Sequence, residues 1–186
     1  MLKQANGRFK EALLFMYDMH RGQTRKIFNV PFYIHLLDVD SILAKNGAQE
    51  YLLSAGALHD TVEESKYTGV TKDDLLRLFG RQVTDLVMAV TEEDKSLPWK
   101  ERKAAALHKL KGANRDVQML KCADKLANTR DMIDGLRTEG DRIWTYFNAG
   151  KEQQKEHMYA VLKAFDQIDD LPMYRQYKEA LWQLFG

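Results

Sequence analysis

Residues 117–128 read VQMLKCADKLAN, and their apolar residues recur at the spacing of an α-helix. Val117 and Leu120 would share one helical face with Asp124 and Asn128, because successive members of this set are three or four positions apart. No comparable run alternates with period two. We therefore predict an all-α fold of about eight or nine helices. The same period recurs in Phe9-Leu13-Met16-His20, Leu52-Ala55-His59, Val83-Leu86-Val87-Val90 and Met158-Val161-Leu162-Phe165.

Short motifs mark where the predicted helices begin and end. Thr71–Asp74 resembles a capping box, and Pro98 suits the first turn of a helix. The longest predicted loops lie near residues 22–31, 61–70 and 91–97. Glycines stand near the predicted breaks, at positions 22, 47, 80, 112, 135 and 140.

The composition predicts one globular domain over residues 1–186, with 28 basic against 27 acidic residues and a net charge of +1. A charge so balanced gives no general attraction to nucleic acid or to an anionic membrane, and no apolar run is long enough to span a bilayer. The single cysteine, Cys122, excludes an intrachain disulfide and fits a reducing compartment. We expect a cytoplasmic protein that binds neither nucleic acid nor membranes.

Ionisable side chains stand on four apolar helical faces, at His20, His35, His59 and Asp124. An unpaired buried carboxylate costs on the order of several kcal/mol, so these positions need partners. Two explanations are open: each residue has its own partner in the core, or one bound cation contacts several of them. Asp60, next to His59, would complete a set of two imidazoles and two carboxylates. Such a set suits Mn²⁺, Fe²⁺, Co²⁺ or Zn²⁺.

The order of several sequence blocks is more specific than any single pair of residues. Together the blocks resemble the HD-domain metal-dependent phosphohydrolases, in particular the alarmone hydrolase domain of RelA/SpoT-type proteins and their small stand-alone relatives. The resemblance covers about residues 10–150 and implies an HD-type helical bundle. The blocks are His20-x-x-Gln23-x-Arg25-Lys26, Pro31-Phe32-x-x-His35, residues 57–64 (ALHDTVEE), Phe79-Gly80-x-x-Val83 through Thr91, residues 97–103 (LPWKERK) and Leu120-Lys121-x-Ala123-Asp124-Lys125-x-x-Asn128-x-Arg130.

The resemblance implies roles for individual residues. The ligands of the metal, usually Mn²⁺ in this family, match His35, His59, Asp60 and Asp124. The acidic pair that handles the attacking water matches Glu63 and Glu64. The nucleotide pocket matches Arg25, Lys26 and Asn128, with Lys95, Arg102, Lys103 and Tyr146 as further candidates.

Three positions depart from the family pattern. Glu64 stands where aspartate is usual, which adds a methylene to a group whose reach matters for catalysis. Phe32 replaces a usual tyrosine and so lacks its hydroxyl, and Leu36 stands where proline is common.

The resemblance and the residue chemistry predict a hydrolase of phosphorylated nucleotides. Glu63 lies four residues after His59, which is one helical turn if the helix continues, and could then face a metal-bound water as general base. The predicted reaction removes the 3′-pyrophosphate of guanosine tetraphosphate or pentaphosphate. One alternative is a phosphatase on another nucleotide, such as NADPH. A second alternative is a catalytically silent nucleotide-binding module, and a third is a purely structural helical bundle.

The remaining polar and aromatic residues are interpreted as structural and are given no catalytic role. We expect His20 to orient the loop that carries Arg25, and we assign no role to His108 or His157. The amphipathic segment 153–186 either packs on the core or forms the face of a homo-oligomer, and its sequence pattern is compatible with both arrangements. The three tryptophans are interpreted as packing residues: Trp99, Trp144 and Trp182.

Overall fold

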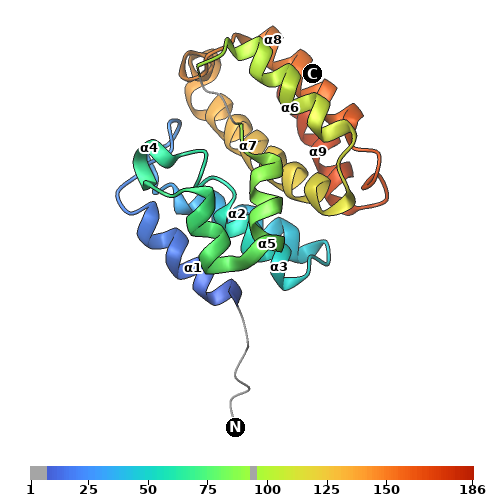
Figure 1. Ribbon diagram of the computed structural model, residues 1–186. Helices are drawn as coiled ribbons and strands as arrows, with labels where there is room; N and C mark the ends of the chain where they lie inside the picture. Colours follow the sequence, from blue (N-terminus) through green and yellow to red (C-terminus); the bar gives the residue numbers. More distant parts are fainter. Residues whose placement is uncertain (1–7, 93–95) are drawn as a thin grey trace.

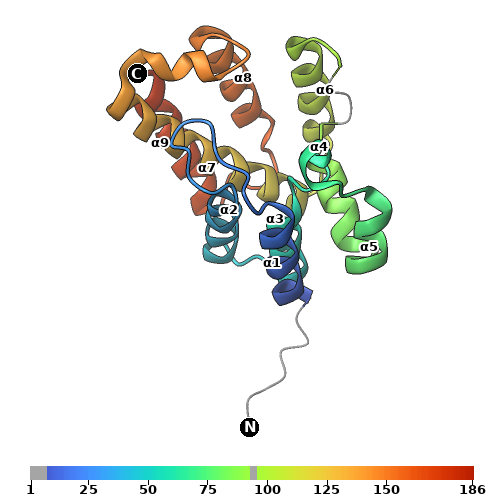
Figure 2. The same ribbon diagram turned by 90° about the vertical axis from the view of Figure 1, so that its left-hand side faces the viewer.

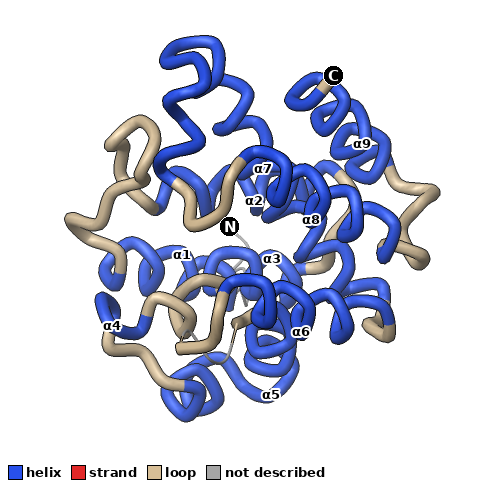
Figure 3. Tube along the Cα trace, turned by 90° about the horizontal axis from the view of Figure 1, so that it is seen from above, coloured by secondary structure: helices blue, strands red, loops and turns tan. Residues whose placement is uncertain are grey.

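The computed structural model describes residues 8–92 and 96–186, and within them the chain is helical, as predicted (Figure 3). These residues form nine α-helices and one 3-10 helix, and their only β-type pairing is an isolated bridge between Thr24 and Pro31. The elements are α1 (Arg8–Met19), α2 (Tyr33–Lys45), α3 (Glu50–Leu58), α4 (Ser65–Thr68), α5 (Lys72–Val90), α6 (Trp99–Lys111), α7 (Arg115–Glu139), η1 (Gly140–Tyr146), α8 (Lys151–Ala164) and α9 (Pro172–Phe185).

Helix α7 is the central element of the core, and it contacts α2, α3, α5, η1 and α9 (Figure 1). Its first turn is capped by Asn114, whose side-chain oxygen accepts a hydrogen bond from the Val117 N–H at 3.1 Å. Leu120 and Leu126 are fully buried, and Asp124 is buried on the same helix. The predicted polar member of this apolar face therefore lies inside the protein.

The other helices form two groups along α7. Figures 1 and 2 show α1, α2, α3 and α5 together at one end, where α3 packs against α1, α2 and α5. Helix α6 packs along α8 on the opposite side of the molecule (Figure 2). Residues carried by α2, α3, α6 and α7 therefore approach one another only because the chain folds back several times.

The predicted helix boundaries are mostly confirmed. Thr71 accepts a hydrogen bond from the Asp74 N–H, and the Asp74 carboxylate accepts one from the Thr71 N–H, which completes the capping box. The predicted loop at residues 61–70 contains the short helix α4. Gly135 was expected near a break but lies inside α7, where an added Cβ would come 2.8 Å from a methyl group of Ile27. This glycine allows the loop before α2 to approach the helix.

The carboxyl-terminal segment packs on the core, which is one of its two predicted arrangements. Tyr177 of α9 is fully buried, and its hydroxyl donates to the Met158 carbonyl at 3.3 Å. Trp182, expected to pack, is instead 72% exposed. Among the described residues, no helix combines the length and apolar character needed to cross a membrane.

Candidate metal centre and active site

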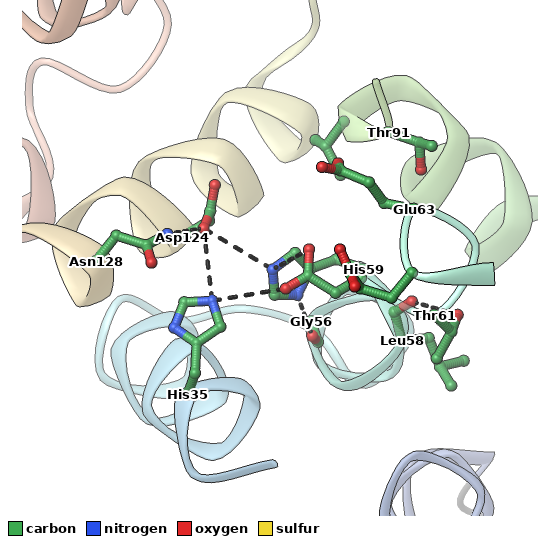
Figure 4. A network of polar contacts seen from close by, with 12 residues as sticks. His35, Gly56, Leu58, His59, Thr61, Glu63, Thr91, Asp124 and Asn128 are labelled. Carbon is green, nitrogen blue, oxygen red and sulfur yellow. Dashed lines mark hydrogen bonds and ion pairs between the residues drawn. The ribbon is translucent and has the colours of Figure 1, made fainter. Parts of the chain in front are cut away.

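Two imidazoles and two carboxylates converge where α2, the end of α3 and α7 meet (Figure 4). Nε2 of His35 lies 3.5 Å from Oδ1 of Asp124 and 3.9 Å from Oδ2 of Asp60. Nε2 of His59 lies 3.4 Å from Oδ1 of Asp60 and 3.9 Å from Oδ1 of Asp124. The structure therefore brings together the four residues named from the sequence.

Both imidazoles direct their Nε2 atoms toward this cluster. Nδ1 of His59 donates to the Gly56 carbonyl at 2.8 Å, and this contact turns Nε2 toward the two carboxylates. The Nε2 atoms of His35 and His59 are buried and make no hydrogen bond to any described residue. Ligand atoms of His35, His59 and Asp124 all lie within 4.8 Å of one another. Orphaned nitrogens beside carboxylates fit a transition-metal ion well.

Asp124 is held as a carboxylate by its own helix. Its Oδ2 lies 3.4 Å from the ammonium of Lys121 and 3.5 Å from that of Lys125. Burial alone would raise the pKa of Asp124, but the charges of Lys125 and Lys121 hold it well below its usual range. Asn128 donates a hydrogen bond to Oδ1 from the next turn of α7. The group is therefore ionised and oriented before any ligand binds.

The acidic pair follows His59 and Asp60 in the loop between α3 and α4. Oε2 of Glu63 accepts a hydrogen bond from the Glu92 backbone N–H at 3.3 Å, and Figure 4 shows Glu63 beside the end of α5. Oε2 of Glu64 accepts one from the Gln23 side chain at 3.2 Å. The two carboxylates are thus anchored by different parts of the chain.

The loop between α1 and α2 carries the predicted basic residues. Arg25 donates to Asn128 at 2.6 Å and pairs with Asp131 at 2.9 Å, and its guanidinium lies 5.6 Å from the ring centroid of Phe32. His20 contacts this loop, since its Nδ1 lies 2.7 Å from the Gln23 side-chain oxygen. His20 also stacks on Phe32, at a centroid distance of 4.9 Å. Phe32 therefore supports the loop without a hydroxyl group.

One cavity of about 530 Å³ joins these groups. It extends from Asp60 and Asp124 to the outer wall made by α6, η1 and α8. The two imidazoles are buried, at 3% exposure each, and do not line it. Lys95, also predicted to bind substrate, lies outside the described residues. The predicted residues that line the cavity are Arg25, Lys26, Asp60, Glu63, Glu64, Arg102, Lys103, Asp124, Asn128 and Tyr146.

The cavity is also lined by residues that the sequence did not predict to be part of the site. Trp99 and His157 line its outer wall, with ring centroids 5.7 Å apart. Burial and the nearby Lys125 and Lys103 charges lower the pKa of His157 to about 3, so this imidazole is neutral. His157 sits among charged residues in the sequence, and no local pattern marks it as a cavity residue. Lys121 precedes Asp124 by three positions, and this helical spacing was a usable signal that its ammonium contacts the Asp124 carboxylate.

Comparison with known proteins shows the family to which the chain belongs. The family described as the HD domain matches residues 12–154. The chain belongs to the HD-domain family. Guanosine-3′,5′-bis(diphosphate) 3′-pyrophosphohydrolase MESH1 of Homo sapiens is 38% identical over 181 residues, which cover 94% of this chain and 91% of that protein. The MESH1 protein of Drosophila melanogaster is 35% identical over 135 residues, covering 71% of this chain and 73% of that protein.

A solved structure shares the HD-domain arrangement over almost the whole length. It is described as "A metazoan ortholog of SpoT hydrolyzes ppGpp and plays a role in starvation responses". It superposes with a TM-score of 0.75 at 29% identity and covers 95% of this chain and 94% of its own. Family and relatives together identify this HD-domain protein as a hydrolase that depends on a divalent metal.

Proposed function

We propose that this protein is a guanosine-3′,5′-bis(diphosphate) 3′-pyrophosphohydrolase that uses Mn²⁺. Water would attack the phosphorus that is bound to the 3′ oxygen of the ribose, and the bond between this phosphorus and the 3′ oxygen would break. Guanosine tetraphosphate would give GDP and pyrophosphate, and the pentaphosphate would give GTP and pyrophosphate. The names of the relatives support this substrate, since MESH1 proteins at 35–38% identity are named for the same reaction.

The observation that carries the proposal is one cavity lined by the two carboxylates of the metal cluster, by the acidic pair and by the basic loop. A nucleotide with phosphates on two ribose positions needs a cation at the reacting phosphorus and further positive charge elsewhere. In this cavity Asp124 and Asp60 lie at the inner end, while Arg25 and Lys26 lie on a separate loop. Its volume, about 530 Å³, lies within the range of ordinary small-molecule sites.

His35, His59, Asp60 and Asp124 would hold the metal. A divalent cation bound there lowers the pKa of a coordinated water and neutralises charge on the phosphate. Glu63, held by the Glu92 N–H, would accept the proton of the attacking water. Glu64, held by Gln23, would orient that water from a second direction. A chain with these groups in place needs no further base.

Substrate binding is proposed for Arg25, Lys26, Asn128 and Tyr146. The Arg25 guanidinium lies between Asn128 and Phe32, where one face can stack on a base or its edge can bind a phosphate. Tyr146 donates its hydroxyl proton to Glu139 at 2.7 Å, which fixes its ring in the cavity wall. Lys95 remains a predicted substrate contact. Arg102 and Lys103 line the cavity but pair with Glu92.

The proposal extends to the partner, the domain organisation and the location of the protein. A nucleotide is the expected partner, without nucleic acid or membrane, and one domain over residues 1–186 is the expected unit. The single cysteine, Cys122, is buried and unpaired, which supports a reducing, cytoplasmic location. Homo-oligomer formation stays open as an alternative.

The test is to incubate the Mn²⁺-loaded protein with guanosine tetraphosphate and, in parallel, with NADPH. We expect equal amounts of GDP and pyrophosphate from the first and little orthophosphate from the second. Orthophosphate release from NADPH alone would contradict the proposed substrate and move the same chemistry to another nucleotide. Bound metal without turnover of either compound would favour a silent binding module.

A further inference from the structure

A buried cluster of charges joins the end of α5 to the start of α6. The Glu92 carboxylate is only 7% exposed, and it pairs with Arg102 at 2.6 Å and with the Lys103 ammonium. The Arg102 and Lys103 side chains are 14% and 21% exposed. Burial works to raise the pKa of Glu92, but the Lys103 ammonium holds it below its usual value. Because both cations face this carboxylate, removing one leaves poorly solvated charge behind.

Arg102 also contacts a residue two positions before the start of α6. Its Nε donates to the Leu97 carbonyl at 3.2 Å, while its Nη1 binds Glu92. One guanidinium therefore fixes the end of α5 relative to the start of α6. The planar, rigid fork of arginine suits such a two-point contact better than an ammonium would.

Glu92 in turn contacts the acidic pair of the active site. Its backbone N–H donates to Oε2 of Glu63 at 3.3 Å, across the space between α5 and the loop after α3. This hydrogen bond depends on where the Glu92 backbone lies, and the side chain of the same residue is held by Arg102 and Lys103. The chain of contacts runs from Arg102 through Glu92 to Glu63.

Arg102 and Lys103 have two alternative roles in the cavity. They could bind a substrate phosphate directly, as the family resemblance implies. The observed contacts instead direct their nitrogens at Glu92. Lys121 and Lys125 line the same cavity from α7 and provide positive charge nearer to Asp124.

We propose that Arg102, assisted by Lys103, is a positioning residue that fixes Glu92 so that the Glu92 backbone N–H orients the Glu63 carboxylate. This inference rests on the proposed function, in which Glu63 accepts the proton of the attacking water. Arg102 acts in it through Glu92 and does not touch the substrate.

Steady-state kinetics on guanosine tetraphosphate separate the two roles. In Arg102→Ala we expect kcat to fall about 10-fold or more, with KM within about twofold of the wild-type value. Glu92→Gln keeps the backbone N–H and weakens the ion pairs, so its kcat should fall less. Arg115→Ala is the matched control, because Arg115 binds Asp170 in an exposed pair and does not line the cavity, and it should leave both constants unchanged. A raised KM with unchanged kcat in Arg102→Ala would overturn the proposal.

Amide hydrogen exchange tests the same inference without any substrate. Exchange at the Glu92 N–H should be slow in the wild-type protein and faster in both Glu63→Ala and Arg102→Ala. Arg115→Ala should not change it. If wild-type protein fails to hydrolyse guanosine tetraphosphate but shows this pattern, the proposed function fails and the contact chain stands. Slow exchange that persists in a folded Arg102→Ala protein would overturn the inference.

Discussion

Nε2 of His35 lies 3.5 Å from Oδ1 of Asp124, although the two residues come from separate helices, α2 and α7. Both are buried, at 3% and 6% exposure, and the contact forms where the two helices pack. The native fold alone brings these atoms together, so a cation that binds between them binds the folded state in preference to the unfolded chain. Metal binding and folding stability are therefore linked.

Metal addition should raise the thermal unfolding midpoint. At a Mn²⁺ concentration 100 times its dissociation constant, the gain is about 2.7 kcal/mol, or about 5–10 °C for a chain of this size. Asp124→Asn should lose most of this shift, because it removes a charged oxygen ligand. Asp134→Asn, on the exposed side of α7, should keep it. The measurement is differential scanning fluorimetry with and without Mn²⁺, and an equal shift in Asp124→Asn would contradict the site.

Arg25→Lys should weaken substrate binding. An ammonium cannot bridge Asn128 and Asp131 as the guanidinium does, nor can it stack over Phe32 in the same way. We expect KM for guanosine tetraphosphate to rise and kcat/KM to fall about 10-fold. Arg21→Lys is the control, since Arg21 lies at the start of the same loop in an exposed pair with Asp18. Equal kinetics for the two variants would count against a substrate role for Arg25.

Glu64→Asp, which introduces the residue that the family resemblance led us to expect, should lower activity in this protein. Oε2 of Glu64 is held by Gln23 at 3.2 Å, and shortening the side chain by a methylene withdraws it from that contact. A displacement of about 1 Å can cost up to 100-fold, so we expect kcat to fall about 10- to 100-fold. Gln23→Ala should change kcat in the same direction. A higher kcat in Glu64→Asp would show that the contact with Gln23 does not determine how Glu64 orients the attacking water.

Asp40 should make the protein less stable as the pH rises. Both of its carboxyl oxygens are buried without a hydrogen bond to any described residue, and burial raises its pKa to about 8. Gly56 leaves the space for it, since an added Cβ there would lie 2.2 Å from Oδ1. Between about pH 4 and 8 the native state keeps a proton that the unfolded state has released. The free energy of unfolding therefore falls by about 1.4 kcal/mol per pH unit from this group.

Asp40→Ala should remove that slope. Its free energy of unfolding relative to wild type should increase steadily between pH 5 and 8 in denaturant titrations. Asp134→Ala, an exposed control, should differ from wild type by a constant amount. A difference for Asp40→Ala that does not depend on pH would mean that the carboxyl ionises freely in the folded protein.

The helical period predicted the fold well because it depends on local spacing. Val117, Leu120 and Asp124 share a buried face as expected, and the capping box at Thr71 formed because its hydrogen bonds are local. The prediction of a helix break near Gly135 was wrong. This glycine lies close to Ile27 of a distant loop, and spacing along one helix does not encode such a contact.

The site was predictable where ligand chemistry restricts the residue type. His35, His59, Asp60 and Asp124 were named from polar residues on apolar faces and from the family blocks, and they converge. The contacts of Arg102 with Glu92, and the place of His157 in the cavity wall, depend on how α6 and α8 return to the site. No local pattern carries that information, because these partners meet only through long-range packing.

The most direct test of the account follows pyrophosphate release from guanosine tetraphosphate as Mn²⁺ is added back to protein treated with a chelator. Release should be absent without metal, rise as Mn²⁺ is added and level off at one ion per chain. Asp124→Ala should release none at any of these concentrations. Full release before metal addition, or undiminished release by folded Asp124→Ala, would contradict hydrolysis at the His35, His59, Asp60 and Asp124 site.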